Sequence, residues 1–366
     1  MKLVTATQMR AIEQSSVEAG VSLDQLMENA GLAVAEAVRD EFGKHSELFG
    51  KRITTFIGGG NNGADGLVAG RHLAKWGASV NAVLCATRIS PDPKQDLALD
   101  SGVSVVDATD DFDTEMLRTL LESTDLIIDA ILGIGSSRAV AEPLSAIMFS
   151  AVESGVPVFA LDLPTGLNSD TGEFDLAGLP ADRTLMLGYP KLGPAIAADP
   201  SVTGEVYVLD IGIPEGLDSQ VNTELITESV AASLIPERPF SGHKGTFGST
   251  LIIGGSKHYL GAVTMATDAA TRSGVGLTFV ATPEPAYRQI AGDIREAMYR
   301  SLPVDGNNDI QAPQAAKSIH ELAAKSSSVT IGPGLGTSSG VKQFLSTVLS
   351  EIDNTTPLVL DADALN

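Results

Sequence analysis

Short continuous apolar runs alternate with longer stretches of mixed polarity along the first half of the chain. Such runs are typical of strands that are covered on both faces. Strands are therefore predicted at 52–57, 79–85, 125–128, 157–161, 183–187 and 205–210, with helices at about 64–76, 114–122 and 141–153. This alternation predicts a doubly wound parallel sheet between two layers of helices, which is a Rossmann-like three-layer α/β fold.

A helix is also predicted before the first strand. Ser22 has the character of an N-cap, and Gln25 follows three residues later, as in a capping box. The apolar residues that follow fall on one helical face, at positions 23, 26, 27, 30, 34, 37 and 38. We interpret this stripe as core packing.

A second α/β run begins after a stretch rich in proline and charge, between Ile213 and Pro239, which indicates a linker. Strands are predicted there at 249–253, 277–281, 328–331 and 357–360, with helices at 262–272 and 341–349. We therefore expect one domain over 1–220 and a second over 225–366. The chain stops at Asn366, directly after a predicted strand, and we interpret the second domain as truncated.

Composition limits the classes of partner. The 366 residues include 43% apolar positions, enough for a substantial core. The net charge of −22 argues against nucleic acid or an anionic membrane as a partner. Cys85 lies in an apolar run and is expected to be a buried thiol. Without a signal peptide or a run of about 18 apolar residues, a cytoplasmic protein is expected.

A glycine-rich segment, 58–66, follows the first predicted strand. A strand, a glycine turn and a helix start together direct free N–H groups at an anion. Asn61, Asn62 and Asp65 add two amides and a carboxylate, which favours a site that also binds hydroxyls, a carboxamide or a metal ion. A plain tight turn is the alternative. The spacing differs from the dinucleotide fingerprint, and no lysine follows as in a Walker loop.

Three acidic residues follow predicted strands of this sheet, namely Asp65, Asp129 and Asp162. Ligands bind beyond the carboxyl ends of parallel strands. A single aspartate there can be a cap or a turn former, but three beside glycine segments favour a shared site. Asn62, Asp129 and Thr165 offer the oxygen ligands that a hard monovalent cation needs. No His/Cys cluster has zinc spacing, so a transition metal is not expected.

Other segments leave two readings open. The segment Gly133–Arg138 suits a second phosphate through its backbone and the hydroxyls of Ser136 and Ser137, while Arg138 either binds the anion or lies on the surface. Lys191 could meet a ligand oxyanion or a carboxylate, or remain solvated. Further backbone-rich anion cradles are expected at 242–245, 254–256 and 332–336, where His243 and Lys244 either touch a nucleotide or lie on an access loop.

Five motifs occur in order: Thr5-x-x-Gln8-Met9-Arg10, Leu26–Gly31, Asn61-Asn62-x-x-Asp65, Asp129-x-x-x-Gly133-x-Gly135 and Asp162–Gly166. Together they resemble the NAD(P)H-hydrate epimerase domain over residues 1 to about 220. From about 225 onward the chain resembles the start of the ADP-dependent NAD(P)H-hydrate dehydratase, a ribokinase-like fold. The matching pieces are Gly242–Gly245, Gly254–Ser256, Gly261-Ala262, Gly332–Gly336 and Asp361–Asn366. The whole resembles the bifunctional NAD(P)H-hydrate repair enzymes.

Three departures from that family pattern matter. Ala64 stands where glycine is usual, and alanine is tolerated only if φ is negative there. Thr165 stands where serine is usual and keeps the hydroxyl. Family dehydratases continue past Asn366 to a histidine-bearing segment and a glycine–aspartate loop with the catalytic aspartate. The resemblance therefore predicts epimerase competence and a dehydratase half that is inactive as given.

The resemblance implies a substrate, NAD(P)HX, which is NAD(P)H hydrated on its nicotinamide ring, and interconversion of its R and S forms. Asp162 is implied at the ring hydroxyl as acid–base residue, helped by Lys191. Potassium is implied at Asn62, Asp129 and Thr165, and ADP or ATP in the second half. The implied substrate-binding residues are Asn61, Asn62, Gly63, Ala64, Asp65, Gly133, Ile134, Gly135, Ser136, Ser137, Arg138, Ala139, Asp162, Ala262, Gly334 and Gly336.

Two other functions stay open on the sequence. A ribokinase-type small-molecule kinase is suggested by the second half alone, and a non-catalytic module could bind dinucleotides or a protein through the same glycine segments. Neither nucleic acid nor a membrane is expected as a partner, and a homo-oligomer is one option for the assembly.

Overall fold

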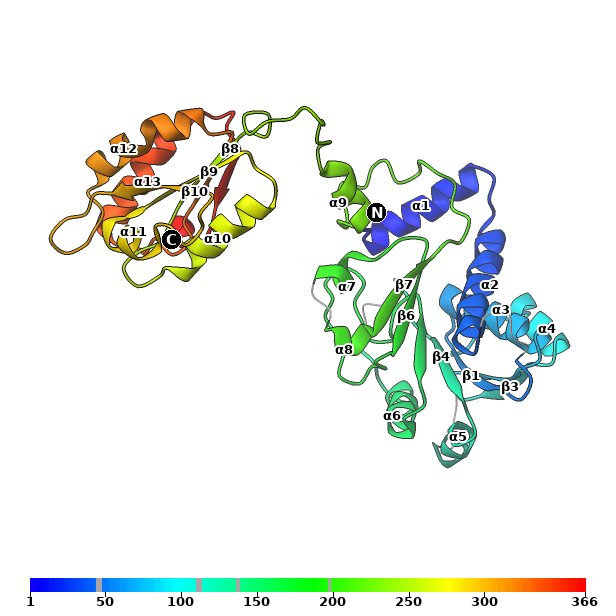
Figure 1. Ribbon diagram of the computed structural model, residues 1–366. Helices are drawn as coiled ribbons and strands as arrows, with labels where there is room; N and C mark the ends of the chain where they lie inside the picture. The colour runs from blue at the N-terminus through cyan, green and yellow to red at the C-terminus, as the bar shows by residue number, and fades with distance from the viewer. Residues whose placement is uncertain (44–47, 110–113, 136–138, 197–198) are drawn as a thin grey trace. The chain divides into compact units, whose positions relative to one another are not determined.

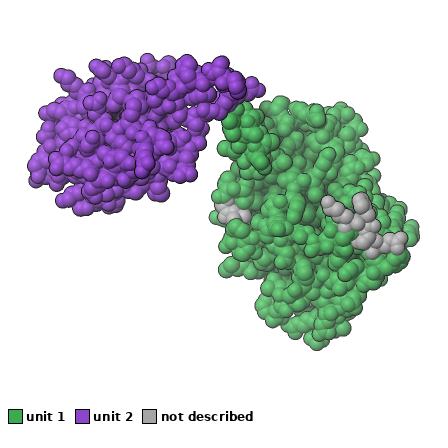
Figure 2. All heavy atoms as spheres, viewed as in Figure 1, with its two compact units in different colours: residues 1–235 green, residues 236–366 purple. Residues whose placement is uncertain are grey.

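The computed structural model describes the chain except residues 44–47, 110–113, 136–138 and 197–198. The chain forms two compact units, residues 1–235 and 236–366 (Figure 2). The division lies inside the proline-rich stretch 213–239. Within the described ranges, every helix falls short of the length and apolar character needed to cross a membrane.

The first unit is built on a seven-stranded sheet in the order β3-β2-β1-β4-β5-β6-β7, and all its described pairings are parallel (Figure 1). The strand order reverses between β1 and β4, which makes the carboxyl ends of these strands the expected ligand position. The strands are β1 (Arg52–Ile57), β2 (Ser79–Leu84), β3 (Ser104–Asp107), β4 (Leu126–Ala130), β5 (Val158–Leu161), β6 (Arg183–Leu187) and β7 (Glu205–Leu209).

Helices cover both faces of this sheet. Neighbouring residues of β1 pack into different cores. Ile57 lies in the core that includes side chains of α1, α2 and α3, and Phe56 lies in the core that includes side chains of α5 and α6. The two cores confirm the predicted three-layer fold. The helices are α1 (Ala6–Glu18), α2 (Leu23–Glu41), α3 (Asn61–Lys75), α4 (Pro93–Asp100), α5 (Thr114–Leu121), α6 (Leu144–Ser154), α7 (Leu192–Ile196), α8 (Pro200–Thr203) and α9 (Glu228–Leu234).

The start of α3 corrects one expectation. The sequence predicts residues 61–65 as part of a loop, whereas α3 begins at Asn61 with Gly60 as its N-cap. The turn after β1 is therefore only Gly58–Gly60. Ala64 lies within the helix and has a negative φ, so alanine is unstrained there.

The second unit also contains a parallel sheet, in the order β10-β9-β8-β11-β12. Its core lies between these strands and α12 and α13 on one side, with a smaller cluster around α10 and α11. The elements are β8 (Ser249–Ile253), α10 (Gly261–Arg272), β9 (Leu277–Pro283), α11 (Glu284–Ile290), β10 (Ala297–Leu302), α12 (Ala312–Lys325), β11 (Ser328–Ile331), α13 (Ser339–Glu351), β12 (Leu358–Leu360) and a 3₁₀ turn (Ala362–Leu365).

Candidate active site

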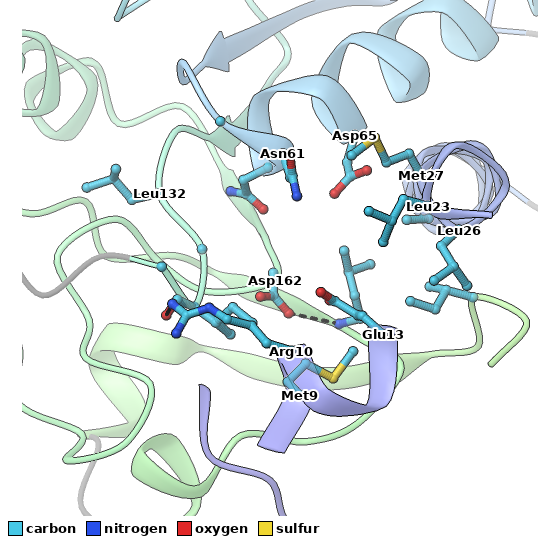
Figure 3. A pocket seen from close by; sticks show the side chains of 18 of the residues that line it. Met9, Arg10, Glu13, Leu23, Leu26, Met27, Asn61, Asp65, Leu132 and Asp162 are labelled. Atoms are coloured by element: carbon cyan, nitrogen blue, oxygen red, sulfur yellow. Dashed lines mark hydrogen bonds between the residues drawn. The ribbon is translucent and has the colours of Figure 1, made fainter. Parts of the chain in front are cut away.

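A cavity of about 660 Å³ lies beyond the carboxyl ends of the central strands of the first unit (Figure 3). Its walls come from α1, α2, the start of α3 and the segments after β4 and β5. Apolar side chains of α1 and α2 form one wall, including Met9, Leu23, Leu26 and Met27. The polar lining residues are Arg10, Glu13, Asn61, Asn62, Asp65, Asp162 and Lys191.

Asp162 and Lys191 form a buried ion pair in this cavity. Asp162 directly follows β5 and has a φ of 67°, a conformation that is uncommon outside glycine and is frequent at functional sites. Its Oδ1 accepts hydrogen bonds from the Lys191 ammonium group and from the Leu187 N–H at 3.1 Å. Lys191 is 1% exposed and also donates to the Leu187 carbonyl at 2.8 Å. The solvated alternative for Lys191 is therefore wrong.

Asp129 and Thr165 are joined behind the cavity wall, and both are fully buried. Asp129 Oδ2 accepts from the Thr165 N–H at 2.7 Å, and Oδ1 accepts from the Thr165 hydroxyl at 2.8 Å. Burial raises the pKa of Asp129 to about 6, although these hydrogen bonds act to lower it. The Thr165 hydroxyl also accepts from the Leu132 N–H at 3.2 Å, which connects the pair to the cavity lining.

Gly133 shows how closely the predicted site residues converge. A Cβ atom at this position would lie 3.1 Å from Asn62 Oδ1 and 3.3 Å from Asp162 Oδ2. The start of α3, the segment after β4 and the end of β5 therefore meet at one point. The Asn62 Nδ2 atom is buried without a hydrogen-bond partner in the described part of the chain, so it is free to bind a ligand.

Asp65 and Glu13 add two further carboxyl groups, and Figure 3 shows both pointing into the same space as Asp162. Burial raises the pKa of Asp65 well above its usual value, and Asp162 and Glu13 raise it further. Burial also raises the pKa of Glu13, as does Asp162, against the opposing effect of Lys191 and Arg10. Both carboxyl groups therefore keep a proton to a higher pH than usual.

Glu13 was not predicted as a site residue, and Arg10 was named only as part of the Thr5-x-x-Gln8-Met9-Arg10 motif, without a role in the site. Their helix carries a capping box, in which Thr5 and Gln8 bond reciprocally at its start. Met9 and Ile12 mark its buried face, and Glu13 is one turn beyond Met9 on the same side. An acidic residue beside an apolar stripe was the available signal.

Some predicted substrate-binding residues lie elsewhere. Ile134 and Gly135 line the cavity. Gly63 and Ala64 are buried inside α3 and Ala139 is exposed, and none of the three belongs to the lining. Ser136, Ser137 and Arg138 lie outside the described residues.

Sequence comparison identifies the family. The model of the YjeF-related protein N-terminus matches residues 23–193, and the model of the NAD(P)H-hydrate dehydratase matches residues 250–366. A bifunctional NAD(P)H-hydrate repair enzyme of Salinibacter ruber is 34% identical over all of this chain, which spans 69% of that protein. The same identity and shares apply to its counterpart in Moorella thermoacetica. The chain belongs to the family of bifunctional NAD(P)H-hydrate repair enzymes.

A solved structure supports the fold of the epimerase-like part of this family member. The crystal structure of a yeast protein, ynu0 or YNL200c, is similar with a TM-score of 0.53 and 26% identity. The similarity covers 62% of this chain and 96% of the yeast chain. The dehydratase match falls within the second unit, for which the sequence analysis expects a ribokinase-like fold.

In the second unit of this repair-enzyme family member, the predicted nucleotide residues lie near one another. The Gly255 N–H donates to the Pro333 carbonyl at 2.8 Å, which joins the segments after β8 and β11. A Cβ atom at Gly334, where φ is 67°, would lie 2.9 Å from Tyr259, just before α10 and Ala262. The Gly336 N–H donates to Asp363 Oδ2 at 2.8 Å. The substrate contacts of Ala262, Gly334 and Gly336 remain predictions.

Proposed function

We propose that the first unit interconverts the R and S forms of NAD(P)HX, the activity of an NAD(P)H-hydrate epimerase. The observation that carries this proposal is the buried Asp162–Lys191 ion pair. The pair lines a cavity at the point where the strand order of the sheet reverses, and the chain belongs to the NAD(P)H-hydrate repair family. The cavity volume is within the range of small-molecule and cofactor sites.

The chemistry requires acid–base groups beside the nicotinamide ring. Hydration of the ring creates a carbon that carries both a hydroxyl group and the ring nitrogen. Inverting this carbon requires proton transfer at the hydroxyl, and a positioned carboxylate is the usual agent. The ammonium group of Lys191 pairs with Asp162 and holds its carboxyl group in place in the cavity.

The dinucleotide is proposed to be held mainly by the backbone. The start of α3 and the Gly133–Gly135 segment offer N–H groups and the positive end of a helix to a pyrophosphate. This mode of binding suits a chain with a net charge of −22, because the backbone provides the positive potential that the side chains lack.

Potassium is proposed at Asn62, Asp129 and Thr165. In the described part of the chain no Lys, Arg or His side chain pairs with Asp129, and buried charges normally have a partner or bind a metal. An amide, a carboxylate and a hydroxyl also form the oxygen set that a hard cation prefers. The residues therefore fit the ion, which would supply positive charge beside the substrate-binding segments.

For the second unit we propose ADP or ATP as the nucleotide bound by the glycine segments after β8 and β11. The assay for this role follows NAD(P)H absorbance after ADP is added to S-NAD(P)HX. Regeneration of NAD(P)H that depends on ADP would support this nucleotide role, and regeneration that is independent of ADP would contradict it.

The epimerase proposal is tested by separating R- and S-NADPHX by chromatography over time, with potassium present and ADP absent. We expect the protein to exceed the spontaneous rate, and Asp162→Asn to lower the rate by about 10²- to 10⁴-fold. NADPH binding, measured by fluorescence, should persist. Asn tolerates positive φ, so the local backbone is retained.

Asp107→Asn is the matched control, because Asp107 is the last residue of β3 in the same sheet but lies outside the cavity lining and is exposed. It should keep the full rate. A double variant, Asp162→Asn with Lys191→Met, avoids leaving a buried lysine unpaired. Failure of the unmodified protein to exceed the spontaneous rate contradicts the proposed function.

A further inference from the structure

Epimerisation requires more than one proton-transfer group, and the inference below rests on the proposed function. The hydroxyl must leave from one face of the ring carbon and water must return to the other. One oxygen of Asp162 already accepts two hydrogen bonds, from Lys191 and Leu187, so this carboxyl group is fixed in place. A second group must therefore give up the proton that Asp162 later receives.

Glu13 has the placement of such a group. It projects from α1 into the cavity, whereas Asp162 comes from the end of β5, so a bound ring can contact two carboxyl groups that come from different elements (Figure 3). Glu13 is half-buried and has no hydrogen bond or ion pair with any residue that the structure describes. Its carboxyl group is thus free to contact a ligand.

The charges that face Glu13 suit a proton donor. Burial and, to a smaller extent, Asp162 favour its neutral form, while Lys191 and Arg10 favour its charged form, and the balance raises the pKa above the usual value of a glutamate. An effective proton donor has a pKa near the working pH, and this balance shifts the pKa of Glu13 upward, in the direction of neutral pH.

Asp65 is the competing candidate. It is 7% exposed, and burial, Asp162 and Glu13 all act to raise its pKa well above the usual range. A carboxyl group that stays protonated can donate a hydrogen bond to the substrate, but it does not readily give up a proton and regain it in each cycle. This difference favours Glu13 over Asp65.

We infer that Glu13 is the second catalytic residue of the epimerase site and transfers the proton to the departing ring hydroxyl. The carbon–oxygen bond breaks, water leaves, and the lone pair of the ring nitrogen forms a carbon–nitrogen double bond. Water then adds to the other face, a carbon–oxygen bond forms, and its proton passes to Asp162. In the opposite direction the two residues exchange roles, and solvent returns the proton between turnovers.

The test uses three variants of the full chain in the chromatographic assay with NADPHX and potassium. Glu13→Gln keeps the shape but cannot donate as an acid, and we expect its rate to fall by about 10²-fold. Glu13→Asp keeps the acid and should retain clearly more activity than Glu13→Gln. Glu18→Gln makes the same change at an exposed site of α1 outside the cavity lining and should leave the rate unchanged.

The pH profile separates proton transfer from a structural role. Glu13 must carry its proton when the hydroxyl departs, so the rate should fall as the pH rises through the pKa of Glu13, which lies above its usual value. Glu13→Gln should remove this fall at high pH, which is the alkaline limb of the pH–rate profile. NADPH binding by the variant, measured by fluorescence, should persist. A structural role of Glu13 would leave the limb in place.

The outcomes distinguish this inference from the proposed function. If the unmodified protein does not exceed the spontaneous rate, the proposed function fails. The inference alone is overturned if the unmodified protein is active but Glu13→Gln loses less than about tenfold. It is also overturned if the alkaline limb survives in Glu13→Gln, or if Glu13→Asp is as impaired as Glu13→Gln.

Discussion

Thr165 illustrates how one hydroxyl connects stability to the proposed ion site. It donates to Asp129 and accepts from the Leu132 N–H, and it is fully buried. Thr165→Val keeps the shape but leaves both partners without the hydroxyl. We expect a loss of about 1–3 kcal/mol in the free energy of unfolding, because buried groups are then unsatisfied.

The same variant tests the potassium proposal. Thermal unfolding in KCl, compared with choline chloride at the same ionic strength, should show stabilisation of the unmodified protein and of Thr165→Ser. Thr165→Val should lose most of that stabilisation. Equal stabilisation of all three proteins by KCl would rule out Thr165 as a potassium ligand.

Side-chain surroundings were the part of the site that could not be predicted. The rule that ligands bind beyond strand ends indicated Asp162, which directly follows β5. Nothing in the local sequence of Lys191 indicated that its side chain would be buried against a residue 29 positions away. Glu13 was missed for a similar reason, because only the tertiary packing of α1 turns it into the cavity.

At the scale of elements, the first turn of α3 lies in close backbone contact with the glycine turn before it. A Cβ atom at Gly63 would lie 2.0 Å from the Gly58 carbonyl oxygen and 2.6 Å from an Arg88 guanidinium nitrogen. The same guanidinium donates to the Gly58 carbonyl at 2.5 Å and forms an ion pair with Asp92 at 2.6 Å. The first turn of α3 is therefore fixed against the preceding glycine turn.

Gly63→Ala should consequently displace backbone and destabilise the protein by about 1–3 kcal/mol. Gly60→Ala is the matched control, because a Cβ atom there meets nothing within 4 Å and its φ of −101° suits alanine. Chemical denaturation of the two variants measures the difference in free energy. Equal stability of the two variants would show that α3 is not held tightly against the turn.

Burial explains part of which strands could be predicted. β1, β6, β8 and β11 were predicted with their observed bounds. β1, β6 and β8 are almost entirely buried, which favours an apolar run in the sequence. The edge strands β3 and β10 were missed: two of the four positions of β3 and two of the six of β10 are exposed. Exposure is not the whole reason, because the edge strand β7 is more exposed than β10 and was predicted.

At the scale of the whole molecule, each compact unit has hydrophobic cores of its own. The clusters of the first unit contain no residue beyond Val221, and those of the second begin at Leu251. Cooperative unfolding follows from shared packing, and no core cluster of the described residues includes side chains of both units, so two transitions are predicted. Differential scanning calorimetry of the full chain should therefore resolve two unfolding events.

Ligands should shift these two events separately, because a ligand stabilises only the unit that binds it. NADPH at 100 times its dissociation constant should stabilise the unit of residues 1–235 by about 2.7 kcal/mol and leave the other transition in place. ADP should act on the transition of residues 236–366 alone. Glu13→Gln should still bind NADPH, so NADPH should shift the first transition of this variant as it does in the unmodified protein. A single transition would show that the two units unfold as one. A common shift of both transitions with NADPH would show that the cavity of the first unit does not bind dinucleotide independently of the second unit.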